Sequence, residues 1–194
     1  MSYNNKEYWQ NRWKNNVYKD EFKTHTKEID NIFNNQELDL ISLLDKINID
    51  PKKILEVGCG FGRLTKILSK KFPDATIVAI DIAKEAVDET NKLNLPNVKA
   101  LQKDILNEKV DEHFDLIFFG EVLLHFPDEQ VKRLFKDLDY NCLIAVDIEY
   151  KNIFDFIIMH LRYLKAYIMG QRHVFMHHFK GFTYHKNGVY VWIK

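Results

Sequence analysis

The pattern of hydrophobic and polar positions changes at Pro51. Before it, apolar residues recur three or four positions apart from Ile29 to Ile47, which predicts an amphipathic helix. Polar residues with aromatics at roughly helical intervals precede that segment, so we expect a helical cap over residues 1–50. After Pro51, short apolar runs alternate with amphipathic segments. Such alternation is typical of βαβ units.

The apolar runs after Pro51 are predicted to be strands of a parallel sheet. They are apolar almost without interruption, as expected for strands that are buried on both faces. Amphipathic segments that separate some of them are predicted to be helices packed on that sheet. The predicted strands are 53–57, 76–80, 98–101, 114–119 and 142–146, and the predicted helices are 62–71, 83–93 and 128–138.

The last fifty residues depart from this alternation. A long apolar helix is predicted over about 151–169, followed by a histidine-rich stretch. Asn187-Gly188 between apolar segments predicts a β-hairpin. The fold class is therefore α/β, a doubly wound and mostly parallel sheet with a C-terminal antiparallel hairpin and an N-terminal helical cap. We expect one domain over 1–194, with a ligand-binding core at 51–147 and a substrate-side helix and closing hairpin at 148–194.

Composition narrows the class of protein. With 28 Lys plus Arg against 28 Asp plus Glu, the chain lacks the basic excess of a dedicated nucleic-acid binder. Its two cysteines, Cys59 and Cys142, have no metal-ligand spacing. The start has no signal-peptide run, and charged residues interrupt the most apolar stretch, 153–169. We therefore expect a cytoplasmic protein without a transmembrane segment.

A glycine-rich loop follows the first predicted strand, in Glu56-Val-Gly58-Cys-Gly60-Phe-Gly62. Glycines between a strand and a helix let backbone N–H groups approach a ligand closely. The third glycine comes one residue too early for the dinucleotide fingerprint, and the charge of Glu56 would repel a diphosphate. A cationic amino-acid ligand suits this loop better. A tight turn without a ligand is the alternative.

Two acidic residues follow the next predicted strands. Asp81 ends the second and can accept hydrogen bonds from both hydroxyls of a ribose, although it can equally cap the helix at 83–93. Asp104 follows the third and can accept a hydrogen bond from an adenine amino group, with a solvated loop residue as the alternative.

Gly120 and Glu121 lie at the carboxyl end of the fourth predicted strand, the edge where open α/β sheets bind ligands. His125 follows and can act as a base or shape the pocket, although a lone histidine is more often structural. In the tail, His173 and His177 are four residues apart, a spacing that metal ligands also use. No third ligand is identifiable, so we expect no metal.

With these signals in this order, residues 53–147 resemble the class I S-adenosylmethionine-dependent methyltransferases, whose fold is Rossmann-like. One departure concerns the turn before the fifth strand, where many members carry a Lys-Pro-Gly-Gly-like sequence and this chain has Asp139-Tyr-Asn-Cys142. The resemblance implies the following cofactor contacts: Glu56, Gly58, Gly60 and Gly62 as the first motif, Arg63 on the methionine carboxylate, Asp81 and Ile82 at the ribose, Asp104 and Ile105 at the adenine, Gly120 and Glu121 under the methionine, and Trp9 and Arg12 on a helix folded over the cofactor.

The resemblance implies methyl transfer from S-adenosyl-L-methionine to an oxygen or nitrogen of an acceptor. An oxygen nucleophile would profit from a base, for which His125 and His177 are the candidates. Aromatic residues in the cap and the tail favour a small-molecule acceptor, with no nucleic-acid partner. The alternatives are a protein or peptide acceptor, a nicotinamide-dependent oxidoreductase, and a non-catalytic binding module. The apolar helix at 151–169 is expected to cover the acceptor site, with a homodimer interface second and a peripheral membrane contact third.

Overall fold

A computed structural model describes residues 6–15, 27–147, 182–186 and 188–194. Strands in these ranges form one sheet in the order β3-β2-β1-β4-β5-β7-β6. β1 to β5 run parallel to their neighbours, and β7 pairs antiparallel with both β5 and β6. The predicted fold class is confirmed. The strands are β1 (Lys53–Val57), β2 (Thr76–Asp81), β3 (Val98–Gln102), β4 (His113–Gly120), β5 (Asp139–Val146), β6 (Tyr184–Lys186) and β7 (Val189–Ile193).

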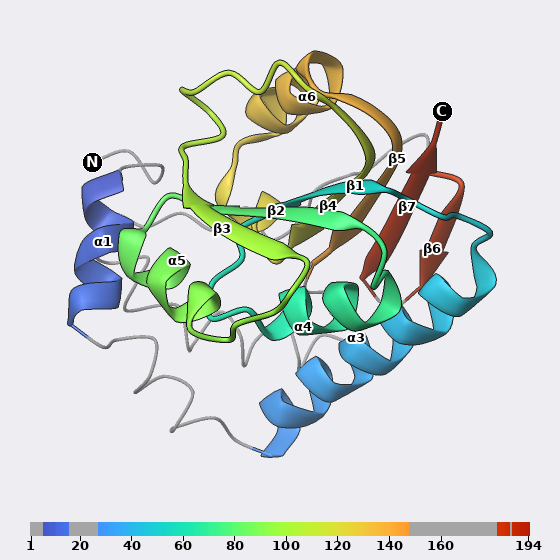
Figure 1. Ribbon diagram of the computed structural model, residues 1–194, viewed down its shortest axis with the longest axis horizontal. Coiled ribbons are helices and arrows are strands. Elements are labelled where there is room, and N and C mark those ends of the chain that lie inside the picture. The colour runs from blue at the N-terminus through green and yellow to red at the C-terminus, as the bar shows by residue number, and fades with distance from the viewer. Residues whose placement is uncertain (1–5, 16–26, 148–181, 187) are drawn as a thin grey trace.

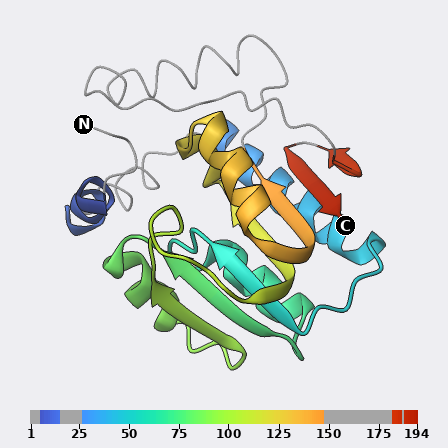
Figure 2. The same cartoon turned by 90° about the horizontal axis from the view of Figure 1, so that it is seen from above.

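Helices cover both faces of the sheet. In Figure 1, α6 lies on one face, and α3, α4 and α5 lie on the other. α1 lies at one end of the molecule and the β6–β7 hairpin at the other, in both views (Figures 1 and 2). The helices are α1 (Lys6–Lys14), α3 (Lys27–Lys46), α4 (Arg63–Lys71), α5 (Lys84–Asn91) and α6 (Asp128–Asp137), with a short 3₁₀ helix, η1, at Leu123–His125.

The core forms because strand residues alternate between two helix-covered faces. Ile54, Leu116 and Ile144 pack with leucines of α3 and α4 on one face. Leu55, Ile117 and Leu143 point the other way, toward Val131 and Leu134 of α6. Each of these strand residues is at most 1% exposed, which explains why the strands are apolar almost without interruption.

Several element boundaries differ from those expected by a few residues, and two of these differences have a clear structural cause. The helix predicted from residue 62 begins at Arg63, because Gly62 adopts a left-handed φ of 75° at the N-cap. The strand predicted from Cys142 begins at Asp139, since Asp139 and Tyr140 already pair with His113 and Phe114. The segment before Cys142 is therefore strand rather than turn, with Tyr140 buried and its two neighbours exposed.

The hairpin closes the sheet as predicted. Lys186 pairs with Val189, and Gly188 has a φ of 77°, a conformation that glycine adopts without steric cost. The Asp147 amide donates to the Gly188 carbonyl at 2.8 Å, which joins the turn to the end of β5. The helix predicted over 151–169, His173 and His177 lie outside the described residues. No helix in the described ranges is both long and apolar enough to span a bilayer.

Candidate functional site

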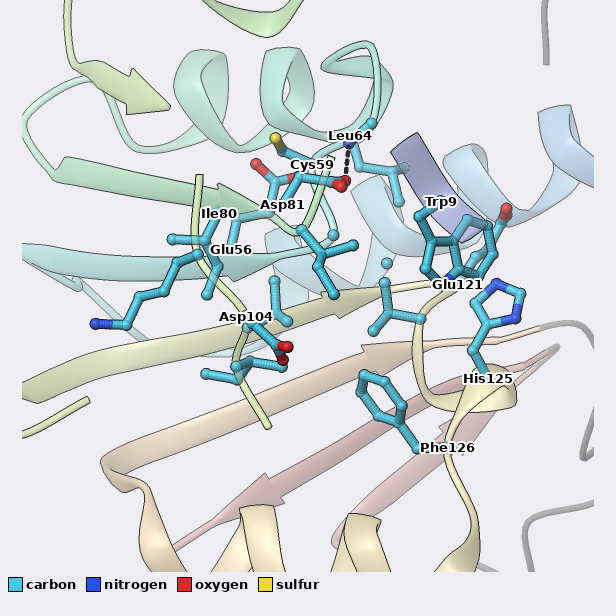
Figure 3. Close-up of a pocket in the computed structure, with 18 of the residues that line it drawn as sticks. Trp9, Glu56, Cys59, Leu64, Ile80, Asp81, Asp104, Glu121, His125 and Phe126 are labelled. Carbon is cyan, nitrogen blue, oxygen red and sulfur yellow. Dashed lines mark hydrogen bonds between the residues drawn. The ribbon is translucent and has the colours of Figure 1, made fainter. Parts of the chain in front are cut away.

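A cavity opens at the carboxyl edge of the parallel strands, between the glycine loop, the end of β4 and helix α1 (Figure 3). Its empty volume, which includes open solvent at the mouth, is about 1070 Å³. All the predicted cofactor residues except Arg12 and Gly62 line it, as does His125. Those lining residues are Trp9, Glu56, Gly58, Gly60, Arg63, Asp81, Ile82, Asp104, Ile105, Gly120 and Glu121.

The glycine loop is held over the end of β2 by its own backbone. The amides of Gly58 and Cys59 both donate to the Ile80 carbonyl, at 2.8 and 3.1 Å. A side chain at Gly58 would collide with Val122, because its Cβ would lie 1.9 Å from Val122 Cγ2. At Gly60, which has a φ of 55°, a Cβ would meet no atom within 4 Å. Packing therefore demands glycine at position 58, whereas Gly60 leaves open space beside the cavity.

Asp81 contacts the backbone at the start of α5 and also lines the cavity. Its Oδ1 accepts a hydrogen bond from the Ala83 amide at 2.9 Å, at the start of α5. Its Oδ2 accepts one from the Gly60 amide at 3.1 Å, and the side chain also lines the cavity. Burial raises the pKa of this carboxyl to about 6, against the opposing effect of these amides. Each oxygen has a second lone pair with which to accept a ligand hydroxyl.

Glu56 is a buried carboxyl that faces the same cavity and is 1% exposed. Its Oε2 has no hydrogen-bond partner among the described residues. Burial, with a smaller contribution from the charge of the nearby Asp81, raises the pKa of Glu56 to about 8. A cation in the cavity would satisfy this oxygen and favour the ionised carboxylate. The position therefore suits the ammonium group of an amino-acid ligand.

Arg63, the first residue of α4, forms ion pairs with two carboxylates. Its Nη1 donates to Glu37 at 2.7 Å and its Nη2 to Glu121 at 2.9 Å. Glu121 has a left-handed φ of 57°, and its amide donates to the Val146 carbonyl at 2.7 Å. Burial raises the pKa of Glu121, and the charge of Arg63 opposes that shift. The methionine carboxylate that Arg63 is predicted to bind would join this network.

Asp104 organises the loop after β3 instead of being a solvated loop residue. Its Oδ1 accepts from the Leu106 amide at 3.0 Å, and its Oδ2 from Asn107 Nδ2 at 2.8 Å. These bonds fix the direction in which Asp104 and Ile105 meet the cavity. The predicted contact with an adenine is compatible with this placement, because each carboxylate oxygen retains a second lone pair.

Helix α1 forms one wall of the cavity. Trp9 meets the His125 ring edge-on at a centroid distance of 4.5 Å, and Trp13 meets Phe61 in the same way at 5.0 Å. Trp13 also packs on the alanines at the start of α5. In Figure 3 the side chains of Trp9, Glu121 and His125 lie together on one side of the cavity. The cap thus brings an aromatic wall to the carboxyl edge of the sheet.

Two predicted cofactor residues do not line the cavity. Arg12 donates to the Tyr8 hydroxyl at 3.0 Å and lies over the Trp9 ring at 5.9 Å, so it supports the aromatic wall from behind. Gly62 faces α5, where a Cβ would lie 2.3 Å from Leu93 Cδ1. Gly62 is therefore needed for helix packing and backbone conformation rather than for close approach to a ligand.

Several lining residues were not predicted. One is Phe126, which follows His125 in the sequence and could have been found from that adjacency. Lys103 is the neighbour of Asp104 and is a second basic residue in the lining. His177 lies outside the described residues, and no set of three or more His, Cys, Asp or Glu side chains within the described ranges could hold a metal. The remaining additions are Trp13, Val57, Cys59, Phe61, Leu64, Ile80, Leu106 and Val122.

Comparison with known proteins agrees with this geometry. A family model described as a methyltransferase domain matches residues 54–142. The chain is 34% identical over 110 residues to a malonyl-[acyl-carrier protein] O-methyltransferase of Acetivibrio thermocellus, covering 54% of this chain and 39% of that protein. It is 29% identical over 98 residues to a trans-aconitate 2-methyltransferase of Deinococcus radiodurans, covering 50% and 37%. The chain thus spans about two fifths of the length of these relatives.

Among solved structures, the chain resembles the plantazolicin methyltransferase BpumL in complex with a monoazolic desmethylPZN analog and SAH. The TM-score is 0.53 at 26% identity, over 73% of this chain and 56% of that one. SAH, S-adenosylhomocysteine, is what S-adenosylmethionine becomes when its methyl group is transferred. The strand order, the glycine loop with its acidic residues, the match of residues 54–142 to a methyltransferase domain and this likeness agree, and over that segment the chain is similar to the class I S-adenosylmethionine-dependent methyltransferases.

Proposed function

We propose that this chain transfers a methyl group from S-adenosylmethionine to an oxygen or nitrogen of a small-molecule acceptor. The observation that carries the proposal is the order of polar groups along one cavity. Neighbouring strand ends present Asp104 after β3, Asp81 on β2 and Glu56 on β1, with the Arg63–Glu121 pair beside β4 (Figure 3). This order matches the base, the ribose and the amino-acid part of a single ligand.

Each group has a defined task in this proposal. Asp81 accepts hydrogen bonds from the ribose hydroxyls, Glu56 receives the ammonium group, and Arg63 binds the carboxylate. When bound, S-adenosylmethionine supplies an electrophilic methyl group on a positively charged sulfur. The aromatic wall of Trp9 and Phe126 excludes water from the space beside that methyl group. The protein contributes mainly alignment and a dry site.

His125 is the proposed base. It lines the cavity just past the carboxyl end of β4, and the edge of Trp9 holds its ring. As the acceptor oxygen or nitrogen forms its bond to the methyl carbon, its proton would pass to the imidazole. The electron pair of the broken carbon–sulfur bond would remain on sulfur. Such a base matters most for a hydroxyl acceptor, because an uncharged amine can attack before it loses a proton.

A small acceptor is favoured by the apolar wall and by the neutral balance of charges. The acceptors that appear in the names of the relatives differ. They are malonyl-[acyl-carrier protein], trans-aconitate and, for one bacterial relative, a tRNA guanine. The test is calorimetric titration with S-adenosylmethionine, S-adenosylhomocysteine and NAD, followed by incubation of cell extract with methyl-labelled donor. We expect binding of the first two ligands and label in the low-molecular-mass fraction. NAD binding without S-adenosylhomocysteine binding would refute the cofactor assignment, and label only in protein would refute a small acceptor.

Glu56→Gln should stabilise the unliganded protein at high pH and weaken cofactor binding. Because the pKa of Glu56 is raised from 4.5 to about 8, the unfolded chain loses this proton at lower pH than the folded chain does. The contribution of Glu56 to the stability of the folded protein is therefore intact below pH 4.5 and declines as the pH rises to about 8. Glutamine abolishes that decline, so we expect a gain of ~2–4 kcal/mol in unfolding free energy at pH 8. Urea denaturation at pH 5, 6.5 and 8 measures it, and equal pH slopes for both proteins would contradict it.

Gly60→Ala should abolish tight cofactor binding while the protein stays folded. A left-handed φ costs a residue with a Cβ roughly 1–2 kcal/mol, but the new atom meets no protein atom within 4 Å. It would instead occupy space that a ligand needs, so we expect the dissociation constant for S-adenosylhomocysteine to rise more than about tenfold. Gly188→Ala, at a φ of 77° in the hairpin, is the matched control for backbone strain. An equal loss of affinity in both variants would remove Gly60 from the site.

His125→Asn should reduce turnover by about 100-fold on a hydroxyl acceptor, with cofactor affinity changed less than about threefold, because only proton transfer is lost. His113→Asn is the control, since His113 lies at the other end of β4, away from the cavity, and pairs with Asp139. Steady-state kinetics with an acceptor identified from extract provides the measurement. Unchanged turnover in His125→Asn would show that this ring only shapes the pocket.

A further inference from the structure

Arg63 is held from two sides by carboxylates of different elements. Its Nη1 donates to Glu37 Oε1 and its Nη2 to Glu121 Oε1. Arg63 and Glu121 line the cavity, whereas Glu37 does not and belongs to α3. α3 precedes residue 54 and so lies outside the segment that the family model matches. Glu37 therefore makes its hydrogen bond to the site through Arg63.

Packing of α3 against the core fixes the position of the backbone around Glu37. Leu40, Leu43 and Leu44 of α3 are buried in the core, at most 2% exposed. Next to Glu37, Gln36 donates from its buried Nε2 to the Asp147 carbonyl at 3.0 Å, just past the end of β5. In Figure 1, α3 runs alongside α4, whose first residue is Arg63. The backbone that carries the Glu37 carboxylate is thus fixed beside the start of α4.

We propose that Glu37 is a positioning residue for Arg63, holding the guanidinium so that it meets the carboxylate of the amino-acid part of the cofactor. This role rests on the proposed function. Glu121 is itself fixed, by its left-handed backbone and by the bond from its amide to Val146. Without Glu37, the planar guanidinium could turn both nitrogens toward Glu121 and form a two-bond pair. A ligand carboxylate would then have to break that pair.

The charge of Glu37 acts in the opposite direction, because it repels a ligand carboxylate. Its side chain is 32% exposed, so water screens this repulsion, whereas the direct bond to Nη1 is short at 2.7 Å. Orientation therefore outweighs repulsion. Glutamine at this position separates the two effects, since its amide oxygen still accepts from Nη1 but carries no charge.

The experiment compares calorimetric affinities for S-adenosylhomocysteine and 5′-methylthioadenosine, a nucleoside thioether without the amino-acid carboxylate. In Glu37→Ala we expect the affinity for S-adenosylhomocysteine, divided by that for 5′-methylthioadenosine, to fall about fivefold. A change of this size is within the range expected for the cost of ordering one long side chain on binding. The affinity for 5′-methylthioadenosine should stay unchanged, and Glu37→Gln should keep the wild-type ratio. Arg63→Ala should lower the ratio further, and adding Glu37→Ala to it should change nothing more.

Asp45→Asn is the matched control. Asp45 lies on the same helix and pairs with Lys71, at the other end of α4, but it is 61% exposed and far from the lining. If ion pairs merely brace α3 on α4, this variant would change the ratio as Glu37→Ala does, and the positioning role would be overturned. An unchanged ratio in Glu37→Ala, or an equal loss in Glu37→Gln, would overturn it too. A wild-type chain that binds neither ligand would instead refute the proposed function.

Discussion

The whole site depends on two hydrogen bonds that place the glycine loop over the end of β2. The amides of Gly58 and Cys59 donate to the Ile80 carbonyl, just past the point where β1 ends and stops pairing with β2. That contact sets the floor of the cavity and the direction in which α4 begins. It also brings the Gly60 amide to the carboxylate of Asp81. A shift of this loop would displace Arg63, Asp81 and the cavity floor together.

The same edge concentrates carboxylates that are unfavourable in the empty protein. Burial raises the pKa of Glu56 to about 8 and that of Asp81 to about 6, so ionising either group lowers the stability of the folded chain. A fold selected for stability alone would place apolar or neutral side chains here. The cost is offset if a ligand brings an ammonium group and hydroxyls to these oxygens. Stability and ligand binding therefore oppose each other at this edge.

Residues outside the matched family segment complete the site. Trp9 on α1 forms the wall against His125, and Glu37 on α3 contacts Arg63. Both helices precede β1 in the chain. Residues 54–142 supply the polar groups proposed to bind the cofactor. The helices before them supply the aromatic wall and a carboxylate that holds one of those groups.

Local sequence was enough for the elements, the sheet and most of the candidate site. Stretches such as Leu116–Phe119 of β4 are continuous apolar runs because both faces of the sheet are buried, and the turn at Gly188 needs a residue that tolerates a positive φ. The carboxyl ends of parallel strands meet at one edge, so the spacing of Glu56, Asp81 and Asp104 along the chain already implied their proximity.

What only the tertiary structure decided was which side of each residue faces the cavity. Gly62 faces α5 and Arg12 lies behind Trp9, although both belong to matching motifs. The contact of Glu37 with Arg63 joins residues 26 positions apart on two packed helices, and side-chain contacts between packed helices leave no periodic signal in either segment.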